Sequence, residues 1–140
     1  MLNYLAVVLA AIASFAFGAA WYGALAKPWL AARGLAPTAA PPPAAVGLLP
    51  ISYVVAFIAE LIMAWMLAGV LLHLARGGLS PSLRTGAISA AFLWFGLVAT
   101  TLVVNHTFQG AKKTLTLIDG GHWLGVLLIQ GAILGGWGVR

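Results

Sequence analysis

Apolar residues gather into four long runs, separated by short polar or proline-rich segments. A helix rises about 1.5 Å per residue, so about 20 apolar residues cross a hydrocarbon core of about 30 Å. Each run is long enough, and we predict four transmembrane helices at about residues 4–26, 51–74, 83–108 and 114–137. The predicted fold is therefore all-α, a single integral membrane bundle covering residues 1–140.

The start of the fourth helix is the least obvious boundary. A helix that begins at Gly121 is barely long enough to reach Trp137 across the bilayer. A start at Thr114, a residue type that caps helices, gives a comfortable span and places Asp119 inside the helix. We therefore predict the longer helix.

The connections differ in length and composition. Residues 27–50 form the longest, and the prolines at positions 37 and 41–43 predict a loop rather than continuous helix. Residues 76–81 contain two glycines and a proline and predict a tight turn. The connection at residues 109–113 is shorter still, which predicts an antiparallel hairpin of the third and fourth spans.

Small residues recur every four positions on three of the spans, which allows close helix approach in lipid. We favour packing inside one bundle over a dimer face for each stripe, and a homo-oligomer stays the alternative. The stripes are Ala6, Ala10, Ser14 and Gly18, then Ala56, Glu60, Ala64 and Ala68, then Gly131 and Gly135.

The amino-acid composition indicates the medium in which the chain folds. Hydrophobic residues make up 63% of the chain and charged residues 6%, against roughly 45–50% and 25% in soluble domains. The seven basic residues are scattered without a basic stripe, so nucleic acid is not an expected partner. The chain has no cysteine, so neither disulfides nor thiolate metal sites are available. The expected partner is the lipid bilayer.

The positions of the basic residues indicate orientation only weakly. The first and third connections carry four of them and the opposite side three, which leans towards both termini outside. An antiparallel dimer of dual topology is the alternative. At one end of the first span we predict four interfacial anchors, namely Trp21, Tyr22, Lys27 and Trp29.

Glu60 is the sharpest chemical signal in the chain. An ionised carboxylate at the bilayer centre costs a few kcal/mol, so Glu60 is expected to face protein or water and to be paired or protonated. It lies on the small-residue stripe of the second span, which points it at a neighbouring helix. A proton or cation site and a purely structural interhelical hydrogen bond are equally weighted interpretations.

Further polar residues on the third and fourth spans predict a track from one interface to mid-membrane. On the helical wheel, Asp119 and His122 share one side of the fourth span. At a rise of 1.5 Å per residue, Glu60, His122 and Thr101 share one layer. The residues expected to continue the track towards the surface are Asp119, Asn105 and His106.

Several chemistries suit such a track. Histidine is the natural proton carrier near neutral pH, so the track can relay protons, bind a cation or fasten the helices. Two histidines and two carboxylates can also hold a metal, but no ligand-spaced motif supports one, and we predict neither metal nor cofactor. No phosphate loop or nucleophile elbow is present, so no enzyme activity is expected.

Six segments resemble an uncharacterised bacterial family of small four-span membrane proteins, known as domain of unknown function seventeen sixty-one. They are NYLAV at 3–7, GAAWY at 18–22, KPW at 27–29, ATTLVVNH at 99–106, LIDGGH at 117–122 and GAILG at 131–135. The resemblance covers nearly the whole chain and implies a four-span architecture in a bacterial membrane. The chain departs from the family pattern in its proline-rich first loop and at Glu60, where a small polar residue is expected.

These observations predict a multi-pass protein of the bacterial inner membrane that binds or moves a small solute or cation with proton coupling. In size and in its buried glutamate the chain is similar to small multidrug-resistance transporters, although their glutamate lies in the first span. The alternative is a structural or accessory membrane subunit without transport activity.

Overall fold

The computed structural model describes residues 1–36 and 43–138, with side chains described for 1–36 and 51–138. All regular elements in these ranges are helices, and four continuous helical segments are long and apolar enough to cross a membrane. The predicted all-α bundle of four transmembrane helices is therefore confirmed. The elements are α1 Tyr4–Ala24, α2 Ala26–Ala32, α3 Pro43–Arg76, α4 Leu83–Leu93, the π-helix η1 Trp94–Ala99, α5 Thr100–Phe108, α6 Lys113–Ile133 and the π-helix η2 Leu134–Gly138.

Local sequence signals account for the beginnings of two helices. The Asn3 side chain accepts a hydrogen bond from the backbone N–H of Ala6 and caps α1. Ser82 caps α4 in the same way through the N–H of Thr85. The prediction that Thr114 caps α6 was wrong: the capping residue is Lys112, and its side chain forms no capping bond.

The predicted loop at residues 27–50 was only partly correct. Helix α2 occupies Ala26–Ala32, and α3 begins at Pro43, eight residues before the expected start of the second span. Proline is tolerated at the first position of a helix because its missing N–H would have no partner there. The alanine- and leucine-rich residues that follow favour helix.

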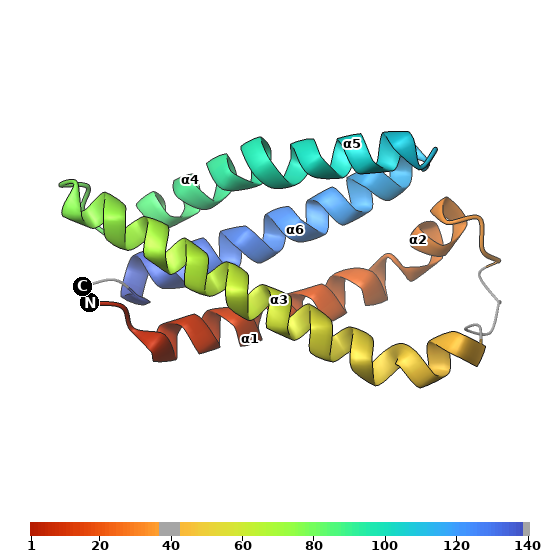
Figure 1. Cartoon of the computed structure of the whole chain (residues 1–140), viewed down its shortest axis with the longest axis horizontal. Coiled ribbons are helices and arrows are strands. Elements are labelled where there is room, and N and C mark those ends of the chain that lie inside the picture. The colour runs from red at the N-terminus through yellow and green to blue at the C-terminus, as the bar shows by residue number, and fades with distance from the viewer. Residues whose placement is uncertain (37–42, 139–140) are drawn as a thin grey trace.

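The helices form a bundle around α6 (Figure 1). The continuous α4–η1–α5 segment and α6 run antiparallel, as predicted, and α6 also packs against α1 and α3. Helix α3 crosses the bundle diagonally, so it approaches α4 at one end and diverges from α5 at the other. No contact joins α3 to α5 in the part of the chain that the structure describes. Helices α3 and α5 therefore diverge without direct contact.

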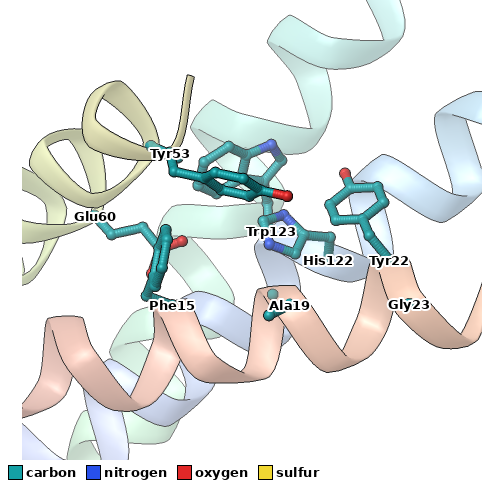
Figure 2. Close-up of a pocket in the computed structure, with 10 residues that line it drawn as sticks. Phe15, Ala19, Tyr22, Gly23, Tyr53, Glu60, His122 and Trp123 are labelled. Carbon is teal, nitrogen blue, oxygen red and sulfur yellow. The ribbon is translucent and has the colours of Figure 1, made fainter. Parts of the chain in front are cut away.

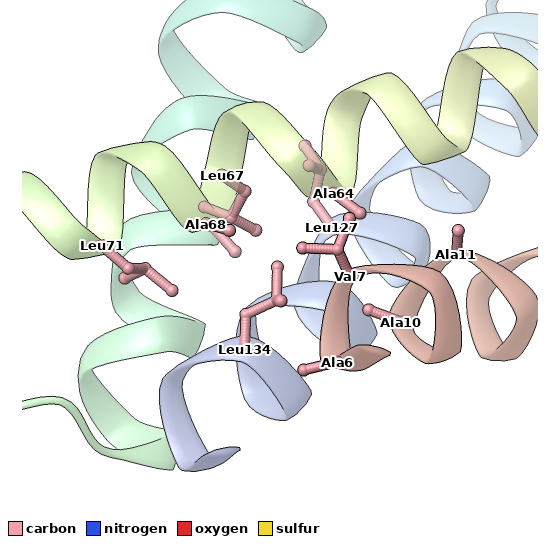
Figure 3. Close-up of a cluster of buried hydrophobic side chains, with 11 residues drawn as sticks. Ala6, Val7, Ala10, Ala11, Ala64, Leu67, Ala68, Leu71, Leu127 and Leu134 are labelled. Atoms are coloured by element: carbon pink, nitrogen blue, oxygen red, sulfur yellow. The ribbon is translucent and has the colours of Figure 1, made fainter. Parts of the chain in front are cut away.

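Small residues bring the helix backbones together. Ala6 and Ala10 on α1 and Ala64 and Ala68 on α3 are 0% exposed, and they pack with Leu134 in the core shown in Figure 3. In η2, a Cβ atom on Gly135 would lie 2.8 Å from the Cα of Gly86 on α4, so the two backbones touch. The small-residue stripes thus pack inside one chain.

Large apolar side chains cover the outside of the bundle. They include Phe92, Phe95, Leu97, Val103 and Val104 on the third span, each at least 51% exposed. A surface of this kind is unfavourable in water and matches acyl chains. With four helices of sufficient length, the protein is a multi-pass membrane protein.

Candidate functional site

Glu60, Ser14 and Gln130 meet where α3, α1 and α6 pack together, and we call these three residues the Glu60 cluster. Ser14 Oγ lies 2.5 Å from Glu60 Oε2 and accepts a hydrogen bond from Gln130 Nε2 at 3.0 Å. Gln130 Nε2 also donates to the backbone carbonyl of Glu60 at 3.0 Å. None of the three residues is more than 2% exposed. The carboxyl group is therefore buried where three helices meet.

The protons available in the Glu60 cluster suit a neutral carboxyl group. Ser14 Oγ also lies 3.1 Å from the backbone carbonyl of Ala11, and a hydroxyl has only one proton to donate. If Ser14 donates to Ala11, the short contact with Glu60 needs a proton on the carboxyl group. In the described ranges no lysine or arginine forms an ion pair with Glu60. The cluster can thus hold Glu60 as an acid without an unpaired charge.

Asp119 lies nearer one end of the bundle, in a second group that we call the Asp119 cluster, made of Tyr22, Trp29, His106 and Asp119. The Tyr22 hydroxyl donates to Asp119 Oδ1 at 2.8 Å, and Trp29 Nε1 donates to the same oxygen at 3.2 Å. His106 Nε2 is 3.9 Å from Asp119 Oδ2, and its Nδ1 is 2.9 Å from the Thr116 hydroxyl. The side chain of Asp119 is 20% exposed. This cluster can carry a charge or a proton close to the surface.

Three of the predicted interfacial anchors make hydrogen bonds to α6. Trp21 Nε1 donates to a backbone carbonyl of α6 at 3.0 Å, while Tyr22 and Trp29 donate to Asp119. Lys27 is exposed. The aromatic residues therefore fasten α1 and α2 to α6, and their role as membrane anchors stays a prediction.

His122 lies between Glu60 and Tyr22 (Figure 2) and is 6% exposed. Its ring centroid is 4.8 Å from those of Tyr22 and Trp123. A Cβ atom on Gly18 would lie 2.7 Å from His122 Nε2, so only glycine leaves room for the ring. His122 Nδ1 is buried and has no hydrogen-bond partner in the described part of the chain. The imidazole is positioned by packing and keeps one nitrogen available.

A cavity of about 490 Å³ lies between α1, α3 and α6, and Glu60 and His122 both line it. Figure 2 shows these two side chains among the aromatic rings. The rest of the wall consists of small residues and of four aromatic rings, those of Phe15, Tyr22, Tyr53 and Trp123. The cavity wall is thus mostly apolar, and its polar side-chain groups are one carboxyl group, one imidazole, one indole N–H and the tyrosine hydroxyls.

The structure does not bring Thr101 and Asn105 into this track. Both are exposed and line a separate groove of about 340 Å³ between α3 and α5. His106, one position further, is the residue that reaches Asp119. The π-helix η1 changes the rotation of every residue after it, because a π-turn holds one residue more than an α-turn. The depth estimate from helical rise gave only the layer of these residues, and not the face of α5 on which each one lies.

The sequence interpretation did not identify the partners of Glu60 as functional residues. Ser14 was assigned only to a small-residue stripe, although it is the one hydroxyl on that stripe, and this was the available signal. Nothing in the sequence distinguished Tyr53 and Trp123 as residues of a site, because aromatic residues are common in membrane helices. In the described ranges no three side chains of histidine, aspartate or glutamate gather as a metal site.

The segments that carry the family resemblance contact one another in the structure. The side chains of Trp21, Tyr22 and Trp29 donate hydrogen bonds to the segment that contains Asp119. His106 lies beside the same aspartate. No curated protein and no solved structure matches the chain. The family model described as "Protein of unknown function (DUF1761)" matches residues 5–135. The predicted resemblance is confirmed, and the chain belongs to this family.

Proposed function

We propose that this non-enzymatic membrane protein binds a small apolar solute with one positive charge and moves it across the membrane in exchange for a proton on Glu60. One observation carries the proposal: a single buried carboxyl group lies in the wall of an otherwise aromatic cavity. We further propose that the protein resides in the bacterial inner membrane and forms homo-oligomers.

The wall of the cavity suits an organic cation. Faces of tyrosine, tryptophan and phenylalanine attract cations within about 6 Å, and most strongly where water is excluded. A volume of about 490 Å³ falls in the usual range of ligand pockets, roughly 300–1,000 Å³. An anion would meet the Glu60 carboxyl group, and the described residues of the cavity wall include no lysine or arginine.

Proton exchange follows from the cost of charge in the membrane. An ionised carboxylate there costs a few kcal/mol unless it is paired. Glu60 therefore favours either its proton or a bound cation, and the two compete for one site. Cation binding releases the proton, and the return of the proton releases the cation.

The Asp119 cluster supports a route for this proton towards one surface. The rings of His122 and Tyr22 are in contact, and the Tyr22 hydroxyl bonds to Asp119. His106 then lies beside Asp119, with 12% of its side chain exposed. Each nitrogen of an imidazole can accept or donate a proton, which suits both positions to a relay.

Binding of two matched probes to the purified protein tests the proposal. Tetraphenylphosphonium and tetraphenylborate share one shape and differ in the sign of their charge. The cation should bind with release of one proton, detected by an indicator dye in weak buffer, and the anion should not bind. In Glu60→Gln the release should vanish and the affinity fall about tenfold or more, the effect of about 1.4 kcal/mol.

Ser52→Ala is the matched control, since Ser52 is an exposed residue on the same helix. Equal binding of the two probes, or unchanged proton release in Glu60→Gln, contradicts the proposal.

Proton-linked flux of the cation in liposomes then separates transport from the accessory alternative. Flux should be lost in Glu60→Gln and in His122→Ala while the bundle stays folded. A wild-type protein that assembles but shows no flux favours an accessory subunit.

A further inference from the structure

We infer that the indole of Trp123 is a movable partition between the cavity and the groove at Thr101 and Asn105, through which the solute reaches Glu60 from the bilayer. The identity of the solute rests on the proposed function, but the access route is a property of the fold alone.

The groove lies between α3 and α5, where the two helices diverge. Figure 1 shows these helices diverging, and no contact joins them in the described ranges. Met63 forms the α3 side of the groove, and η1 and α5 form the other side. Its floor is Trp123, which projects from α6. The groove therefore opens sideways, where the exposed apolar surface of the third span meets lipid.

Trp123 is also a wall of the cavity that contains Glu60 and His122. The same indole thus lies against both hollows, which have volumes of about 490 Å³ and 340 Å³. If the ring turns away, the two become one continuous passage from the lipid face to the carboxyl group.

The way in which Trp123 is held makes such a movement inexpensive. Three other indoles donate their N–H groups to α6, those of Trp21, Trp29 and Trp94, at 2.9–3.2 Å. Trp123 forms no hydrogen bond through its indole among the described residues and is only half-buried. Packing alone holds its ring, so rotation breaks no hydrogen bond, whereas a buried N–H that loses its partner costs about 1–3 kcal/mol.

The chemistry of the groove matches an apolar cation that arrives from lipid. Leu97, Val98 and Leu102 supply apolar contacts, and Thr101 and Asn105 supply a hydroxyl and an amide oxygen. Neither polar side chain has a hydrogen-bond partner within the described ranges. These oxygens can partly replace water around a cation before it reaches Glu60. The groove thus gives Thr101 and Asn105 a role outside the proton track.

The two carboxyl groups of the chain provide a reporter for this route. Glu60 and Asp119 are its only acidic residues. Dicyclohexylcarbodiimide dissolves in the bilayer and reacts with carboxylic acids: the acid oxygen bonds to the central carbon, the proton moves to nitrogen, and the adduct rearranges to an N-acylurea. A charged, water-soluble carbodiimide reacts in the same way but arrives from water. Mass spectrometry of peptides distinguishes the two sites.

The experiment uses the full chain in lipid nanodiscs. In Trp123→Ala the apolar reagent should modify Glu60 severalfold faster than in the wild type. The rate at which it modifies Asp119 should not change. The rate at which the water-soluble reagent modifies Glu60 should not change either. Trp123→Phe, which retains most of the ring, should give a smaller increase. Trp65→Ala is the matched control, because this indole is 51% exposed and lines neither hollow.

An unchanged rate at Glu60 in both Trp123 variants overturns the route, and so does an equal increase with both reagents. Absence of modification at Glu60 in every variant overturns it as well. If Trp123→Ala does not fold, Trp123→Phe alone decides. The proposed function is tested separately, by cation binding. If the protein binds no tetraphenylphosphonium but the Trp123 variants change the rate at Glu60, the access route is supported and the transport proposal is contradicted.

Discussion

The Glu60 and Asp119 clusters hold the two acids of the chain in different ways. Glu60 is 2% exposed, and its carboxyl group is hydrogen-bonded to the hydroxyl of Ser14, beside the amide of Gln130. Asp119 is 20% exposed and accepts hydrogen bonds from two aromatic side chains beside an imidazole. Both acids lie at contacts with α1, so the difference comes from depth and partners.

This comparison shows how position in the bundle determines what a carboxyl group can do. Where three helices bury it, neutral partners suit a carboxyl group that keeps its proton or exchanges it for a cation. Near the end of the bundle, several N–H and O–H donors can support a charged carboxylate. Glu60 is therefore suited to exchange its proton for a cation, and Asp119 is suited to pass protons on.

The largest expected effect is that of Ser14→Leu, which tests whether the Glu60 cluster is as tightly packed as its burial indicates. The larger side chain must separate three helices and leaves Glu60 and Gln130 without their shared partner. We expect a loss of about 3 kcal/mol or more in the free energy of unfolding, measured by detergent titration. Ser52→Leu at an exposed position should change it by less than about 0.5 kcal/mol. Equal stability of the two variants would show that the cluster is loosely packed.

A smaller effect is expected from Asp119→Ala, which removes the acceptor shared by Tyr22 and Trp29. Two donors lose their partner at a partly exposed site, so we expect a loss of about 2 kcal/mol in the free energy of unfolding. Asp119→Asn keeps an acceptor oxygen in the same place and should lose clearly less. If the two substitutions are equally harmful, the charge matters more than the hydrogen bonds, and the distinction between the clusters weakens.

The smallest effect is expected from Trp29→Phe, which removes one hydrogen bond of 3.2 Å and keeps a ring against Tyr22. The free energy of unfolding should fall by about 1 kcal/mol or less. Trp65→Phe on the exposed face of α3 provides the baseline. A loss as large as that of Asp119→Ala would mean that Trp29 alone holds α2 in place.

The sequence by itself determined the medium and the helices. Run lengths and composition are local properties, so they predicted four membrane spans and the hairpin of the third and fourth. The four-residue stripes predicted the faces that pack, since a small side chain permits close approach in any helix pair. The same local evidence failed at residues 27–50, where prolines mark a change of direction but do not exclude α2 or the early start of α3.

Only the tertiary structure decided which polar groups meet. The sequence placed Glu60 and His122 at one depth, and they do share a cavity, but Ser14 and Gln130 are the residues that contact the carboxyl group. Such partners depend on how each helix rotates about its axis, and packing of the whole bundle sets that rotation. Depth along α5 likewise did not show which face packs inward: in the structure His106 lies beside Asp119, while Asn105 is exposed.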